Sequence, residues 1–172
     1  MHPRADGQPC VITDANILIN FIKIGRLDIL QSLRIYTFHI PDEVYEEVVY
    51  PAQRVVLDQA LNDGWLKRTE ITDHVELRYY AQYRRQMGDG EAACLAISIC
   101  RKWIMASDEQ KKRMISKQVL DILGENYWLN TPGILLKAIK ENILTVAQAD
   151  TIKDALAQNR FVMHFASFQD LL

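Results

Sequence analysis

Two acidic residues follow short apolar runs whose composition is typical of buried strands. Asp14 comes directly after the run CVIT at residues 10–13, and Asp108 comes just beyond the run WIMA at residues 103–106. In parallel sheets the carboxyl ends of the strands meet at one edge, and binding sites form outside that edge. We therefore expect Asp14 and Asp108 to contribute to a common site.

A third acid, Glu91, stands at the start of a strongly apolar segment. Residues 92–100 contain a single polar residue, Ser98, which predicts a helix that is buried on nearly every side. A carboxylate at the beginning of a helix is stabilised by the helix dipole and by free backbone amides. Glu91 is therefore the third candidate for the site.

The fourth candidate belongs to the helix expected after the second strand, where Glu43, Glu46 and Glu47 compete. On a helical wheel, Glu47 lies nearest the apolar stripe of Val44 and Val48, and Glu46 points most nearly away from it. This geometry favours Glu47, and the other two glutamates remain alternatives.

Four acidic side chains in one cleft repel one another, and their pKa values rise unless a cation joins them. A ligand set made of oxygen atoms suits the hard divalent ions Mg2+ and Mn2+. Such ions activate water and stabilise the attacking and leaving oxygens during phosphodiester hydrolysis. The four histidines show no spacing typical of metal ligands, so zinc is not expected. A single acid after a strand is often only a helix N-cap, and the inference depends on all four together.

A framework of alternating strands and helices is needed to bring these acids together. Short apolar runs alternate with segments of helical periodicity, which predicts an α/β domain whose mostly parallel sheet is covered on both faces. Gly25 and Pro51 are expected to interrupt helices, and a capping box of Thr145 and Gln148 opens the last one. We expect strands at residues 10–13, 35–40, 65–68, 103–106, 127–129 and 161–165, and helices at 15–33, 42–62, 73–87, 92–100, 109–123, 132–142 and 146–159.

Length and composition indicate one globular domain over residues 1–172, with residues 1–8 as a flexible N-terminus. The chain is 49% hydrophobic and 24% charged, with a formal net charge of -2, which argues against a basic protein that coats duplex nucleic acid. No apolar stretch approaches the roughly 18 residues of a membrane span, and the N-terminus has no apolar signal core. A cytoplasmic protein that does not interact with membranes is expected.

Four segments resemble, in order, the acidic motifs of the PIN-domain ribonuclease family: VITDANILI, IPDEVYEEV, GEAACLAIS and MASDEQKKR. Residues 131–144 (TPGILLKAIKENIL) resemble the VapC-like toxin branch of that family. The resemblance implies a three-layer α/β/α fold and a Mg2+- or Mn2+-dependent endoribonuclease that cleaves RNA. It also implies a cognate antitoxin protein and a homodimer as partners. The metal-binding and catalytic acids carried over by position are Asp14, Glu47, Glu91 and Asp108.

The same resemblance assigns Asn16 and Thr13 to the support of the first acid. Two neighbouring acids are rivals for the assigned positions, Asp89 for Glu91 and Glu109 for Asp108.

Two groups of basic and aromatic residues are candidates for contacting RNA, because aromatic rings and guanidinium groups stack on unpaired bases and hold phosphates. Solvated helix faces explain both groups as well. The alternative reading of the whole chain is a catalytically inactive PIN-like module that only binds or scaffolds. The candidate contact residues are Arg78, Tyr79, Tyr80, Tyr83, Arg84 and Arg85 in one group, and Lys111, Lys112, Arg113 and Lys117 in the other.

Overall fold

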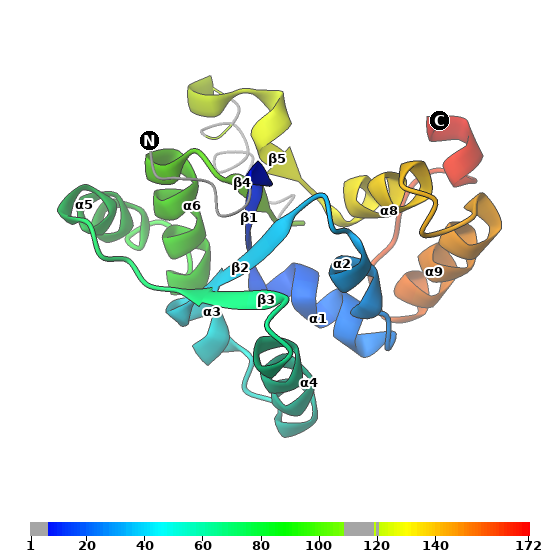
Figure 1. Cartoon of the computed structure of the whole chain (residues 1–172), viewed down its shortest axis with the longest axis horizontal. Coiled ribbons are helices and arrows are strands. Elements are labelled where there is room, and N and C mark those ends of the chain that lie inside the picture. Colours follow the sequence, from blue (N-terminus) through cyan, green and yellow to red (C-terminus); the bar gives the residue numbers. More distant parts are fainter. Residues whose placement is uncertain (1–6, 109–118, 120) are drawn as a thin grey trace.

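A computed structural model describes residues 7–108, 119 and 121–172 of the chain (Figure 1). In these residues five parallel strands form one sheet in the order β3-β2-β1-β4-β5. Helices cover both faces of the sheet, so the expected three-layer α/β/α fold with a parallel sheet is confirmed. The strands are β1 (Cys10–Thr13), β2 (Thr37–Pro41), β3 (Leu66–Thr69), β4 (Ile104–Ala106) and β5 (Trp128–Leu129).

The helices fall into two groups on opposite sides of the sheet. In Figure 1, α5 and α6 lie on one side, and α1, α2, α8 and α9 lie on the other. In the described part of the chain, no helix has both the length and the apolar character needed to cross a membrane. The helices are α1 (Ala15–Lys23), α2 (Asp28–Ser32), α3 (Asp42–Glu47), α4 (Pro51–Asn62), α5 (His74–Tyr83), α6 (Asp89–Arg101), α8 (Thr131–Lys140) and α9 (Val146–Gln158), with short 3-10 turns η2 (Glu125–Tyr127) and η3 (Phe168–Leu171).

Strand β1 lies at the centre of the sheet because its residues are apolar enough to be buried on both faces. Val11 and Ile12 are completely buried, and α6 packs across β1 and its two neighbours. The chain progresses from β1 through β2 to β3 in one direction and then returns to β4 and β5 on the other side of β1. The order of strands therefore reverses between β1 and β4, and ligands of open parallel sheets bind at such a switch point.

The expected helix interruptions are present, and one helix ends earlier than expected. Gly25 has a positive φ of 65° between α1 and α2, and Pro51 begins α4 after α3 has ended. The helix expected over residues 73–87 ends at Tyr83, with its N-cap at Asp73 as expected. The chain turns before Gly88, whose extended backbone begins α6 and allows that helix to return across the sheet.

The strand expected at residues 161–165 is absent from the described structure, so that prediction was wrong. The side chains of this segment alternate between half-buried and exposed, and His164 is exposed. The alternation reflects packing of the apolar side chains on the core without pairing to the sheet. Lys153 of α9 donates hydrogen bonds to the carbonyls of Phe165 (3.3 Å) and Ala166 (2.6 Å), which replaces the partners that a neighbouring strand would provide.

A nearly buried ion pair fixes the C-terminal end of α6 to α5. The guanidinium group of Arg101 donates to both carboxylate oxygens of Glu76, at 2.6 and 2.9 Å, and to the carbonyl of Glu70 at 2.8 Å. Glu76 is only 2% exposed. Burial raises its pKa, but the hydrogen bonds and the charge of Arg101 outweigh that effect, and the net shift is downward.

Replacing Arg101 with methionine is expected to lower the free energy of unfolding by about 3 kcal/mol, because a buried carboxylate loses its charged partner. Denaturant unfolding at neutral pH measures this change. Arg26→Met is the matched control, since the Arg26–Asp28 pair is exposed and its loss should cost less than about 1 kcal/mol. Equal effects of the two substitutions would contradict the structural role given to Arg101.

Candidate active site

Asp14 lies at the end of β1 and caps the N-terminus of α1. Its Oδ1 atom accepts a hydrogen bond from the backbone N–H of Ala15 at 2.7 Å. Its Oδ2 atom accepts from Nδ2 of Asn16 at 2.9 Å and from the hydroxyl of Ser107 at 3.1 Å. Asp14 is only 2% exposed, so these donors hold a buried carboxylate at the switch point of the sheet.

Glu47 is the last residue of α3, and its carboxylate lies against the N-terminus of α6. Its Oε1 atom accepts a hydrogen bond from the backbone N–H of Gly90 at 2.8 Å. Val44 and Val48 are completely buried, as the helical wheel requires for the stripe beside Glu47. Helix packing thus turns this glutamate toward Asp14.

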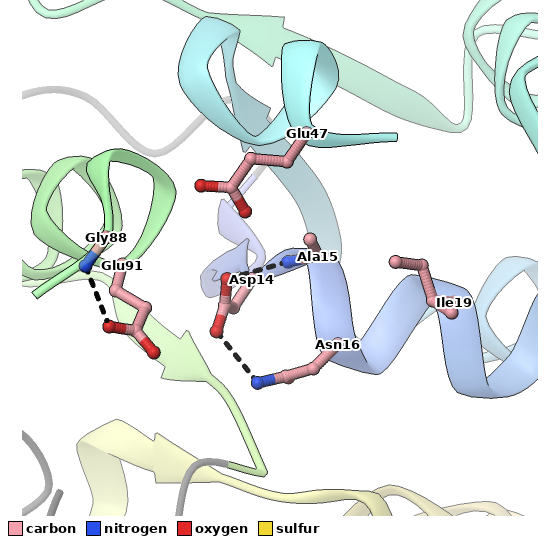
Figure 2. Close-up of a pocket in the computed structure, with 7 residues that line it drawn as sticks. All are labelled: Asp14, Ala15, Asn16, Ile19, Glu47, Gly88 and Glu91. Atoms are coloured by element: carbon pink, nitrogen blue, oxygen red, sulfur yellow. Dashed lines mark hydrogen bonds between the residues drawn. The ribbon is translucent and has the colours of Figure 1, made fainter. Parts of the chain in front are cut away.

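Glu91 is the third residue of α6, and its Oε2 atom accepts a hydrogen bond from the backbone N–H of Gly88 at 3.3 Å. Figure 2 shows the carboxylates of Asp14, Glu47 and Glu91 projecting toward one another from three different elements. They line one pocket of about 350 Å3, together with Ala15, Asn16, Ile19 and Gly88. Three of the four candidate acids are therefore brought together.

The carboxylate of Asp108 faces away from this pocket toward α8. It accepts hydrogen bonds from the backbone N–H of Thr131 at 2.7 Å, from the Thr131 hydroxyl, and from Nδ2 of Asn20 at 3.1 Å. The backbone N–H of Asp108 donates to Oδ1 of Asn16 at 3.2 Å, and Asn16 thereby links the ends of β1 and β4. Asp108 is a neighbour of the three clustered acids and is not part of the lining of their pocket.

Sequence reasoning missed the two side chains that hold Asp108. Asn20 lies one helical turn after Asn16 on α1, so the spacing of the two asparagines was a local signal. Thr131 had no such signal, because it is distant in the sequence and approaches Asp108 only through the pairing of β4 with β5. Thr13, expected to support the first acid, places its hydroxyl 3.5 Å from the Asp14 backbone carbonyl and not on the carboxylate.

The carboxyl groups of Asp14 and Glu47 have raised pKa values. Burial is the largest cause for Asp14, and the negative charges of Glu91 and Glu47 add to it, so that its pKa rises to about 7 although Ala15 and Ser107 donate to it. Burial and the charge of Glu91 also raise the pKa of Glu47. Burial raises the pKa of Asp108. A cation bound among these carboxyl groups would therefore stabilise their charged forms.

A family model for the PIN domain matches residues 10–172, which is nearly the whole chain. The chain belongs to the PIN-domain family. No curated protein matches the sequence. PIN domains are typically nucleases, and they generally use divalent metal ions.

The atoms that this PIN domain presents in the pocket are of the kind that binds a divalent cation. Asp14, Glu47 and Glu91 supply only carboxylate oxygens, and burial together with the charges of neighbouring acids raises the pKa values of Asp14 and Glu47. Within the described residues, no group of three or more His, Cys, Asp or Glu side chains is arranged closely enough to hold an ion. Each of the three carboxylates is instead held by protein donors.

The alternative acids lie beside the pocket of this PIN domain and not in it. Glu43, Glu46 and Asp89 line an adjoining pocket together with Asp42, and Glu47 lines both pockets. Burial and the charges of Asp42 and Asp89 raise the pKa of Glu43. Glu109, the rival of Asp108, lies outside the described residues.

The candidate RNA contacts on α5 differ in exposure. Tyr83 is buried and stacks on Tyr79 at 5.9 Å between ring centroids, so Tyr83 is a core residue and is not available to stack on RNA bases. Arg84 pairs with Asp89 at 3.3 Å, beside the acidic pockets. Arg78, Arg84 and Arg85 are exposed. Four further candidates lie outside the described residues: Lys111, Lys112, Arg113 and Lys117.

Proposed function

We propose that this PIN domain is an endoribonuclease that hydrolyses RNA phosphodiester bonds with Mg2+ or Mn2+. The observation that carries the proposal is the convergence of Asp14, Glu47 and Glu91 on one pocket at the switch point, where the pKa of Asp14 is raised to about 7. These three residues would hold the metal, and Asp108 would act beside them. When bound, a divalent cation activates water and stabilises the attacking and leaving oxygens of the phosphodiester.

The chain's own residues prepare the site for that reaction. Ala15, Asn16 and Ser107 orient the Asp14 carboxylate, while Thr131 and Asn20 orient that of Asp108. Such hydrogen bonds fix the ligand oxygens before substrate binds.

Exposed arginines near the acids would hold the RNA backbone. Arg84 lies 5.3 Å from the ring centroid of the half-buried Tyr80 and pairs with Asp89. A guanidinium group donates two parallel hydrogen bonds to a phosphate group as it does to a carboxylate, and an RNA strand presents a phosphate at every nucleotide. Arg84 and Arg85 would therefore position the strand beside the carboxylates.

The test is cleavage of a labelled total RNA pool by the wild-type protein with Mn2+, Mg2+ or EDTA. We expect fragments with either ion and none with EDTA. Asp14→Asn, purified in parallel, excludes a contaminating ribonuclease, because contamination would cleave equally in both preparations. Absence of cleavage together with absence of Mn2+ binding by calorimetry would favour the alternative function, an inactive binding or scaffolding module.

The finer part of the proposal is that the protein is the toxin of a toxin–antitoxin pair, acts as a homodimer and works in the cytoplasm. It is supported by the resemblance of residues 131–144 to the toxin branch of the family. Induced expression in a bacterial host should arrest growth, and Asp14→Asn should not. Growth arrest relieved by co-expression of a protein encoded beside it would identify the antitoxin, and sedimentation would measure the oligomeric state.

A further inference from the structure

Gly90 makes an unusually close approach to the carboxylate of Glu47. Its backbone N–H donates to Oε1 of Glu47 at 2.8 Å. A Cβ atom built on Gly90 would lie 2.6 Å from that oxygen, 2.8 Å from Cδ and 2.9 Å from Oε2. These separations are far inside van der Waals contact, so any larger residue at this position displaces the Glu47 carboxylate.

The backbone of Gly90 does not itself require glycine. Gly90 is the second residue of α6, with helical geometry, and it is not among the glycines with positive φ. At such a position alanine stabilises a helix relative to glycine. The requirement for a small residue therefore comes from the contact with Glu47, which belongs to a different helix.

The same contact explains how Glu47 reaches the pocket. Glu47 is the last residue of α3, so no following turn of its own helix packs beside its side chain. The N-terminus of α6 supplies a free N–H group and the positive end of the helix dipole to the carboxylate. Gly90 is buried, and the contact holds Glu47 where α6 also presents Glu91.

We propose that Gly90 is a positioning residue, which sets the place of the Glu47 carboxylate in the pocket by donating its N–H and by leaving room for both carboxylate oxygens. The expected effect of Gly90 on metal binding rests on the proposed function. Its structural part, the coupling of Gly90 to Glu47, holds independently of catalysis.

A double-mutant cycle on the full chain tests the coupling, with wild type, Gly90→Ala, Glu47→Asp and the double variant. Calorimetry measures the Mn2+ affinity of each, and RNA cleavage is followed in parallel. Gly90→Ala is expected to lose about 10- to 100-fold in Mn2+ affinity, the range for residues that orient metal ligands. In the Glu47→Asp background the same substitution should change the affinity less than about threefold, because the shorter side chain does not meet the added methyl group.

Gly64→Ala is the control for an alanine substitution that only destabilises. Gly64 has a φ of 78° in the turn between α4 and β3, remote from the pocket. Its replacement should lower the midpoint of thermal unfolding by about 3 °C and leave the Mn2+ affinity unchanged. Gly90→Ala should show the opposite pattern, with a retained midpoint and a lost affinity.

Amide hydrogen exchange separates failure of this inference from failure of the proposed function. The Gly90 amide should exchange slowly in wild type and at least about tenfold faster in Glu47→Ala, since the first N–H groups of a helix have no partner within the helix. If wild type binds no Mn2+ but Glu47 protects this amide, the coupling stands and the metal function fails. Unchanged exchange in Glu47→Ala, or wild-type Mn2+ affinity in Gly90→Ala, would overturn the inference.

Discussion

Asp14→Asn is expected to abolish RNA cleavage while it stabilises the metal-free fold by about 2 kcal/mol at pH 8. The two effects have one cause. Asp14 carries a charge that burial, Glu91 and Glu47 all disfavour, which is why its pKa rises to about 7. Asparagine removes that charge and keeps an oxygen for the N–H of Ala15, but it is a poor ligand for Mg2+ or Mn2+.

The sign of the pH dependence follows from the raised pKa of Asp14. Between about pH 4 and pH 7 the folded protein retains the proton, whereas the unfolded chain has released it. The contribution of Asp14 to the free energy of unfolding therefore falls as the pH rises through this window. The advantage of Asp14→Asn should be largest above pH 7 and disappear below about pH 4.

Denaturant unfolding in EDTA at pH 4, 6 and 8 measures this difference. Asp63→Asn, an exposed carboxylate after α4, is the control and should lie within about 0.5 kcal/mol of wild type at each pH. Added Mn2+ should stabilise wild type and leave Asp14→Asn unchanged, because only the wild-type fold would bind the ion. A stability difference that is the same at pH 4 and pH 8 would show that the charge of Asp14 is not disfavoured in the folded protein.

Glu47→Gln is expected to reduce RNA cleavage at least about a hundredfold, and the neighbouring Glu46→Gln to change it less than about twofold. Both residues are exposed, but Glu47 lines the pocket with Asp14 and Glu91, whereas Glu46 lines only the adjoining pocket. The two substitutions remove the same charge from adjacent positions. The comparison therefore separates ligation of a metal from a general loss of negative charge.

Initial rates of cleavage on one RNA substrate at saturating Mn2+ provide the comparison. Thermal unfolding of both variants checks that the fold is retained, and Glu47→Gln should be slightly stabilised because burial and repulsion by Glu91 both disfavour the charge of Glu47. Comparable losses in both variants would mean that the acidic surface acts through its net charge. A loss of cleavage confined to Glu46→Gln would show that Glu46, and not Glu47, is the acid of α3 that acts in the site.

The sequence by itself determined the five strands of the sheet and the order of the acids along the chain. Residues 10–13 are so consistently apolar and β-branched that a buried strand ending at Asp14 was the expected structure, and Gly25 and Pro51 interrupt helices because of their own backbone chemistry. The periodicity around Val44 also favoured Glu47, the glutamate nearest the buried stripe, and Glu47 lines the pocket. These features are local, and local spacing is enough to predict them.

Contacts between distant residues were decided only by the tertiary structure. The pairing of β1 with β4, and of β4 with β5, brings Ser107 to Asp14 and turns Asp108 toward Thr131, and no local pattern encodes those partners. The apolar run at residues 161–165 predicted a strand, but the segment packs against the core, and Lys153 binds the carbonyls of Phe165 and Ala166 at its end. The position of the Asp108 carboxylate and the conformation of residues 161–165 both depend on which groups supply their hydrogen bonds. Those groups are distant in the sequence, and only folding brings them together.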